Sequence, residues 1–215
     1  MTVNEAFPFT EGMTAAKANT GADNIQVMTS DGGYVTYFLS NGYYGKSGYN
    51  ADLVNKWAKD GETLPTTETL IPGAGFWYLS RGAAAGKNHA IQVAGQVSAA
   101  AKKDYTINKT YTLIGSPYPA AIAINGGIEV TGSTAAKANT GADNIQIMTA
   151  DGGYTTYFLS NGYYGKSGYN AELANKWAKD GETVPTTDKF PVGGGAWYLS
   201  RTANGTISFN SPIAE

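Results

Sequence analysis

A chain of 215 residues with 42% hydrophobic residues can form one large all-β domain or two of about one hundred residues each, and its apolar content excludes wholesale disorder. Charged residues make up only 15%, and a formal net charge of −2 provides no basic field for nucleic acid, so no such partner is expected. No apolar run is long enough to span a membrane as a helix.

The amino terminus, MTVNEAFPFTEG, contains neither a basic stretch nor an apolar run, so the sequence predicts no signal peptide here. Cys is absent, as is common in bacterial proteins exported past the inner membrane, although disulfides are also typical of oxidising compartments. If the protein is exported, we expect its signal to have been removed.

The chain contains two near-copies of one sequence. A shift of 120 residues aligns Thr14–Arg81 with Thr134–Arg201 without a gap, and 55 of the 68 pairs are identical. Seven of the 13 differences lie in Glu68–Phe76 against Asp188–Ala196. Expected surfaces match as well as the expected core, although most exposed substitutions cost under about 0.5 kcal/mol. Either the duplication is recent, or both copies must present the same face.

Within each copy, NIQVMTSDGGYVTYFLSNG and its counterpart alternate as β-strands do. Asp31-Gly32-Gly33 predicts a hairpin turn, because Gly accepts the positive φ that the favoured turns require. Asn41-Gly42 offers a second turn. We expect the second copy to repeat this hairpin through Ile145–Gly162.

The next segment, Asn50–Gly61, allows two interpretations. Asn50 as an N-cap, Leu53 and Trp57 four residues apart, and Gly61 as a stop predict one or two helical turns, which we prefer. Alternatively the segment is irregular, with KWAKDG as a short strand and turn.

The remaining segments read as strands. GFWYLSR and GAWYLSR, Gly75–Arg81 and Gly195–Arg201, predict buried strands after glycine-rich corners. Alternating AIQVAGQV (Ala90–Val97) and TISFNSPI (Thr206–Ile213) predict a closing strand for each unit. Asp104–Ile124 has no counterpart before the first copy, so it should give the second unit one or two extra strands and leave the first one strand short.

Short strands between frequent turns are typical of sandwiches and barrels. The sequence therefore predicts an all-β, mainly antiparallel fold. It consists of two tandem homologous β-sandwich- or barrel-like units, 1–97 and 98–215, with at most a short helix in each.

The run TLIGSPYPA, followed by GADNIQIM, YTTYFLSNG and VGGGAWYLSR, resembles repeats of secreted and cell-surface proteins of Gram-negative bacteria. Those repeats have an LIGNPYPA-like strand, a D-x-I hairpin and PGxGFW. The resemblance implies export, an extracellular or cell-surface location and a β-rich repeat, with no reaction attached. The first unit departs from the pattern by lacking the LIGSPYP strand, and Pro191-Val192 stands where the first copy has Ile71-Pro72.

Signals for catalysis are weak. His89 is the only histidine and lies between the copies, so neither copy can supply a Ser-His-Asp triad or, without Cys, a zinc site. Asp60 with Glu62, and Asp180 with Glu182, offer the two carboxylates that a glycosidase needs, but adjacent turn carboxylates are usually solvated. We expect no enzyme activity and no catalytic residue.

No cofactor or metal is expected either. Calcium stays an alternative, because four residues offer oxygen ligands in turns without the spacing of an EF-hand loop. These residues are Asp23, Asn24, Asp31 and Asp60.

The repeated stretch SNGYYGKSGYN, Ser40–Asn50 and Ser160–Asn170, is interpreted as a loop that presents aromatic rings. Rings flanked by amides and hydroxyls suit sugars, and Tyr, Ser, Gly and Asn also serve adaptable protein-binding loops. The alternative is that the Trp and one Tyr pack inward as core residues. The candidate binding residues are Tyr43, Tyr44, Tyr49, Trp57, Tyr163, Tyr164, Tyr169 and Trp177.

These patterns favour a non-enzymatic secreted or cell-surface structural protein that assembles with itself, as a polymerising subunit, or with another surface protein. A unit that lacks a strand would expose a sheet edge, and such edges recruit strands from neighbours. The alternative function is a carbohydrate-binding module whose two equivalent sites gain avidity on a polymeric glycan.

Overall fold

The computed structural model describes residues 1–29, 31–71, 73–82, 90–93, 99–108, 110–202 and 204–212; His89 lies outside them. Contacts divide the described chain into two compact units, one of residues 1–29, 33–71, 76–82 and 90–93, and one of the rest. The prediction of an all-β, mainly antiparallel fold is confirmed, and the helices α1 (Val3–Ala6) and α2 (Ile124–Gly127) are four residues each. Within the described residues, none of the helices has the length and apolar character needed to cross a membrane.

The first unit contains a four-stranded antiparallel sheet with the order β3-β2-β1-β4. The predicted hairpin around Asp31-Gly32-Gly33 is confirmed: Met28 pairs with Tyr34, and the Thr29 N–H donates to the Gly33 carbonyl at 2.9 Å. Gly32 has a φ of 86°, the conformation for which the sequence selects glycine. The strands are β1 (Asn24–Met28), β2 (Tyr34–Tyr44), β3 (Gly48–Lys59) and β4 (Phe76–Leu79).

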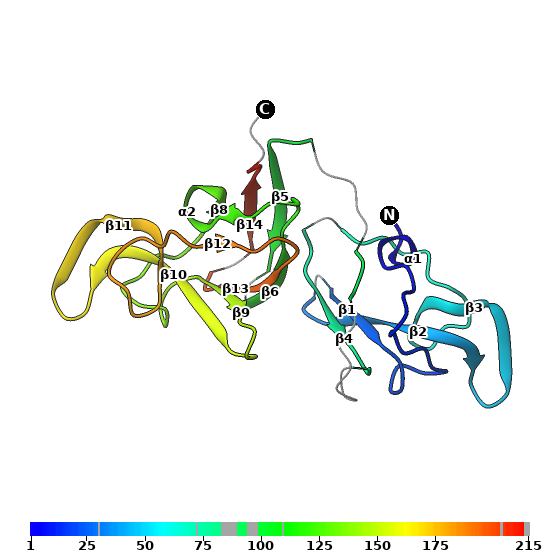
Figure 1. Cartoon of the computed structure of the whole chain (residues 1–215). Helices are drawn as coiled ribbons and strands as arrows, with labels where there is room; N and C mark the ends of the chain where they lie inside the picture. The colour runs from blue at the N-terminus through cyan, green and yellow to red at the C-terminus, as the bar shows by residue number, and fades with distance from the viewer. Residues whose placement is uncertain are drawn as a thin grey trace. The chain divides into compact units, whose positions relative to one another are not determined.

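The second unit repeats this arrangement and adds strands. Its main sheet has the order β11-β10-β9-β13-β6, and β10 and β11 form one long hairpin (Figure 1). These strands are β9 (Asn144–Met148), β10 (Tyr154–Tyr164), β11 (Gly168–Lys179), β13 (Gly195–Ser200) and β6 (Thr110–Gly115).

Two smaller sheets complete the second unit, with the orders β5-β14-β8 and β12-β7. The expectation that Asp104–Ile124 supplies strands here is confirmed, since β6 pairs with β13 and β5 pairs with β14. The strands are β5 (Lys102–Ile107), β14 (Gly205–Asn210), β8 (Ile128–Thr131), β12 (Lys189–Phe190) and β7 (Ile122–Ala123).

The closing-strand predictions have different outcomes. β14 confirms the one for Thr206–Ile213 as far as Asn210. Ala90–Val93 forms no strand, and 94–97 lie outside the described residues.

The two predicted buried strands also differ. β13 is largely buried as predicted, between neighbouring strands β9 and β6, whereas the residues of β4 are partly or fully exposed.

The preferred helix over Asn50–Gly61 is wrong, because this segment is strand β3, paired with β2. Ser40 pairs with Lys56 and Asn41 with Val54, which leaves Asn55 as an extra residue with a φ of 56°. A bulge of this kind moves the following side chains to the other face of the sheet. The four-residue spacing of Leu53 and Trp57 therefore reflects a bulged strand, and the two side chains belong to different clusters.

A buried carboxylate joins the first strand of each copy to its last. In the second unit, Asp143 is 0% exposed, and its two oxygens accept from the Tyr198 hydroxyl at 2.6 Å and the Arg201 N–H at 2.8 Å. In the first unit, Asp23 receives the equivalent bonds from Tyr78 and Arg81. The aspartate of the D-x-I motif is therefore a structural acceptor.

Alkaline pH is expected to destabilise the fold through its buried tyrosines. Burial and the hydrogen bond to Asp143 raise the pKa of Tyr198, and burial raises the pKa of Tyr105 to about 12. An unfolded tyrosine ionises near pH 10, so above that value the unfolded chain loses protons that the folded chain retains. The contribution of these tyrosines should be constant below this window, and the free energy of unfolding should fall above it, as urea titrations at about pH 8 and about pH 11 would show; equal values would contradict the assignment.

Candidate binding surface

The repeated Tyr-Gly-Asn stretch is the tip of a β-hairpin, which corrects its interpretation as a loop. Tyr43 on β2 pairs with Tyr49 on β3, their ring centroids lie 4.9 Å apart, and the side chains are 54% and 53% exposed. Tyr163 and Tyr169 repeat this geometry at 4.8 Å. Asn41-Gly42 lies inside β2 as part of the bulged ladder, with Gly42 at a φ of 93°, and does not form a turn.

The opposite face of each tip is fastened to the unit. The Tyr44 ring lies over Gly48 so closely that a Cβ on Gly48 would be 2.3 Å from it, and Tyr44 packs against the cluster that contains Leu53. Asn50 lies near the start of β3 and stabilises it: its Oδ1 accepts from the Asp52 N–H at 3.0 Å, and its Nδ2 donates to the carbonyl of Thr63, after the strand, at 3.2 Å. The exposed tyrosine pair therefore stands on an ordered hairpin. Tyr164 takes the place of Tyr44 in the second copy.

The two candidate tryptophans are core residues, 1% exposed at Trp57 and 4% at Trp177. Trp57 packs edge-on to Phe7 and Tyr78, and Trp177 packs edge-on to Tyr198. The inward alternative thus describes these two residues, and the exposed candidate surface of each copy consists of the tyrosine pair, which we call the tyrosine tip. The tips are Tyr43 with Tyr49 and Tyr163 with Tyr169.

Some of the sequence differences between the copies accompany different core contacts, and others lie at exposed positions such as Val54, Leu64 and Ile71. Phe76 packs on Phe7 at a centroid distance of 4.9 Å, whereas its counterpart in the second copy is Ala196 and Phe209 contacts Phe190 instead, at 5.8 Å. By contrast, Thr36–Ala51, which includes the tip, is identical to Thr156–Ala171. Because the fully buried residues of the first copy are also unchanged in the second, the identical tips fit either a recent duplication or a shared role of the two tips.

The candidate acidic residues form no cluster. Asp60 and Glu62 are exposed after β3, and Asp60 Oδ2 accepts from Asn19 Nδ2 at 2.8 Å. Asp180 is held in the same way by Asn139. In the described part of the chain, no group of three or more His, Cys, Asp or Glu side chains is placed to hold a metal ion.

One pair of structural residues was missed in the sequence because it lies outside the gapless alignment. Asn4 accepts from the Trp57 N–H at 2.8 Å and donates to the carbonyls of Trp57 and Thr66 at 3.1 and 2.9 Å. Asn125 makes the same three bonds in the second unit, to Trp177 and Thr186. The shared pattern is an apolar residue, Asn, two residues and another apolar residue, displaced by 121 positions.

Comparison of this chain with protein-family models, with curated proteins and with solved structures finds no match.

Proposed function

We propose that this protein is a non-enzymatic structural protein of the extracellular space or cell surface, whose two tyrosine tips make contacts with other copies or with another surface protein. The observation that carries the proposal is the same exposed ring pair, on the same ordered hairpin, in both units. Tyrosine supplies a large contact area at low cost in conformational entropy, and it is enriched among residues that dominate protein interfaces.

The location rests on the low charge of the chain and on its resemblance to bacterial surface repeats. Polar character comes from Asn, Ser, Thr, Gly and tyrosine hydroxyls in place of ions, with charged residues at 15%. Fractionation of cells that express the full gene, followed by protease treatment of intact cells, tests it. Resistance of the protein to protease until lysis would contradict a surface location.

Replacing all four tip tyrosines by serine should weaken self-association at least about tenfold, because paired interface aromatics often contribute 2 kcal/mol or more. Light scattering at rising protein concentration measures this. The control is Tyr34→Ser with Tyr154→Ser, which removes two tyrosines of similar exposure, 44% and 48%, outside the tips. Association that survives the tip variant, or a wild-type chain that stays monomeric, would exclude self-assembly through the tips and leave another surface protein as partner.

Binding of a polymeric glycan is the second candidate, favoured by the tilt of the paired rings. The ring planes meet at 55° and 53°, so sugar C–H faces can stack on exposed rings beside Asn, Ser and Lys side chains. Tyr43→Ala and Tyr163→Ala together should then lose far more binding than either alone, since two sites on one chain bind with avidity. A glycan array without hits would remove this candidate.

A further inference from the structure

The two tryptophans occupy equivalent places, but their indole N–H groups differ. Trp57 Nε1 donates to the Phe7 carbonyl at 2.7 Å. The indole N–H of Trp177 has no acceptor among the described residues, although Trp177 is 96% buried. In the described chain, three polar side-chain atoms are fully enclosed and lack a partner: Asn24 Oδ1, Tyr105 Oη and Asn144 Oδ1. The indole nitrogen of Trp177 is not one of them. Solvent therefore reaches this N–H.

A cavity adjoins Trp177 within the second unit. Its volume is about 410 Å³, inside the range of about 300–1,000 Å³ that is usual for small-molecule sites. Ile128 and Leu159 form apolar wall, and the exposed residues Glu129 and Lys176 stand at the rim. Asn175, also a lining residue, is held at a φ of 58° by the bulge in β11, which repeats the bulge at Asn55.

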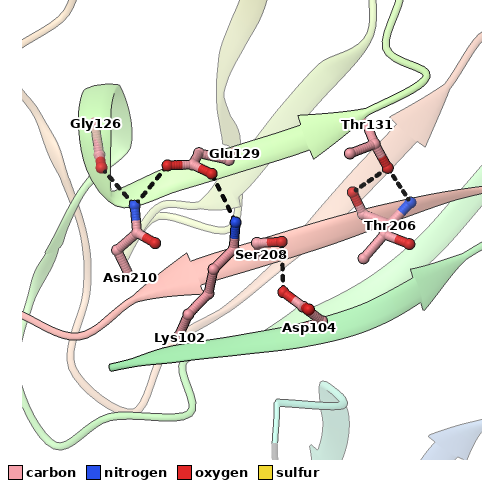
Figure 2. A network of polar contacts seen from close by, with 8 residues as sticks. All are labelled: Lys102, Asp104, Gly126, Glu129, Thr131, Thr206, Ser208 and Asn210. Atoms are coloured by element: carbon pink, nitrogen blue, oxygen red, sulfur yellow. Dashed lines mark hydrogen bonds and ion pairs between the residues drawn. The ribbon is translucent and has the colours of Figure 1, made fainter. Parts of the chain in front are cut away.

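Polar groups at this cavity include both donors and acceptors. The Glu129 carboxylate on β8 accepts from Lys102 and from Asn210, each at 2.8 Å, and Figure 2 draws both contacts. The Lys102 hydrogen bond, followed by that of Asn210, lowers the pKa of Glu129, so the group stays an ionised acceptor at neutral pH. Lys176 supplies a cationic donor, and Trp177 also lines the cavity, so its solvent-accessible indole N–H offers a second donor.

We propose that this cavity binds a sugar ring, with a ring or hydroxyl oxygen accepting from the Trp177 indole N–H and sugar hydroxyls donating to Glu129. A polyhydroxylated ring offers donors and acceptors at once, as this mixed lining requires. The fixed negative charge of Glu129 disfavours a phosphate or carboxylate ligand. The site is separate from the tyrosine tips and does not depend on their function.

Two-dimensional ¹H–¹⁵N spectra provide the test, because the tryptophan indoles give separate signals, assigned with Trp57→Phe and Trp177→Phe. Glucose, galactose, mannose and N-acetylglucosamine are each titrated to about 100 mM, a hundredfold above a millimolar Kd. At least one should shift the Trp177 indole signal and leave that of Trp57, whose N–H is already bonded, unchanged. Without sugar, the Trp177 N–H should also exchange with solvent faster than that of Trp57.

Variants at the rim distinguish specific binding at this site from non-specific binding of sugars. Glu129→Gln should weaken sugar binding about tenfold, the effect of losing one charge-assisted hydrogen bond. Lys176→Met should weaken binding as well, whereas Lys56→Met, at the same position of the first copy, should have no effect. If none of the four sugars shifts the Trp177 signal, if both indoles shift equally, or if inorganic phosphate binds and sugars do not, the proposal is wrong.

Discussion

Replacing Asp143 by Ala is expected to lower the free energy of unfolding of the second unit by about 3–5 kcal/mol. The carboxylate is fully buried and holds both the Tyr198 hydroxyl and the Arg201 N–H. Removing it leaves the buried Tyr198 hydroxyl and the partly buried backbone N–H of Arg201 without their partner, at about 1–3 kcal/mol each. Chemical unfolding of the whole chain, followed by far-ultraviolet circular dichroism, should show part of the transition move to a lower denaturant concentration.

Asp180→Ala is the matched control, since this exposed carboxylate accepts one hydrogen bond from the half-buried Asn139. Its loss should change the free energy of unfolding by no more than about 1 kcal/mol. Asp143→Asn should lie between the two, because the amide keeps one acceptor oxygen of the carboxylate. An Asp143→Ala variant as stable as Asp180→Ala would refute the structural role of the buried carboxylate.

Gly48→Ala should destabilise the first tyrosine tip by about 2 kcal/mol, the usual cost of overpacking. A Cβ at this position would be 2.3 Å from Cε2 of Tyr44, and the ring would have to leave its place on the hairpin. The displaced ring also releases the tip, so contacts made by Tyr43 and Tyr49 should weaken together with stability. Chemical unfolding gives the first quantity, and light scattering gives the second.

A double-mutant cycle isolates this contact. In a Tyr44→Ala background, Gly48→Ala meets no ring and should be neutral or stabilising by about 0.5–1 kcal/mol, because Ala loses less backbone freedom than Gly in a strand. A Gly48→Ala effect that is the same in both backgrounds would show that the ring contact is not the cause.

Local turn chemistry explains what could be predicted from the sequence. Asp31-Gly32-Gly33 identifies the first hairpin because only a few residue types accept its backbone conformation, and two-residue alternation then identifies the flanking strands. The bulge at Asn55 defeats the same reasoning, because the extra residue interrupts the two-residue alternation and places Leu53 and Trp57 on different faces of the sheet. The hairpin tip was mistaken for a loop because Gly42 and Gly48, which normally mark turns, here make room for tyrosine rings.

Packing over long distances in sequence could not be predicted. The burial of Trp57 depends on Asn4 and Phe7, some 50 residues earlier, and the cavity beside Trp177 depends on β8 and α2, which lie outside the gapless alignment. The polar residues around both tryptophans in the sequence led us to group them with the exposed aromatic residues. Their burial follows from the elements that cover them, which differ between the units.

The asparagine anchors have a consequence for how such a chain can diversify. Asn4 and Asn125 make the same three hydrogen bonds, yet the first belongs to an amino-terminal turn that seals the tryptophan, and the second introduces a strand beside an open hollow. The same asparagine hydrogen bonds thus attach segments of different sequence to the equivalent strand in the two units. The two units therefore keep the same hairpin while different elements pack beside the equivalent tryptophan.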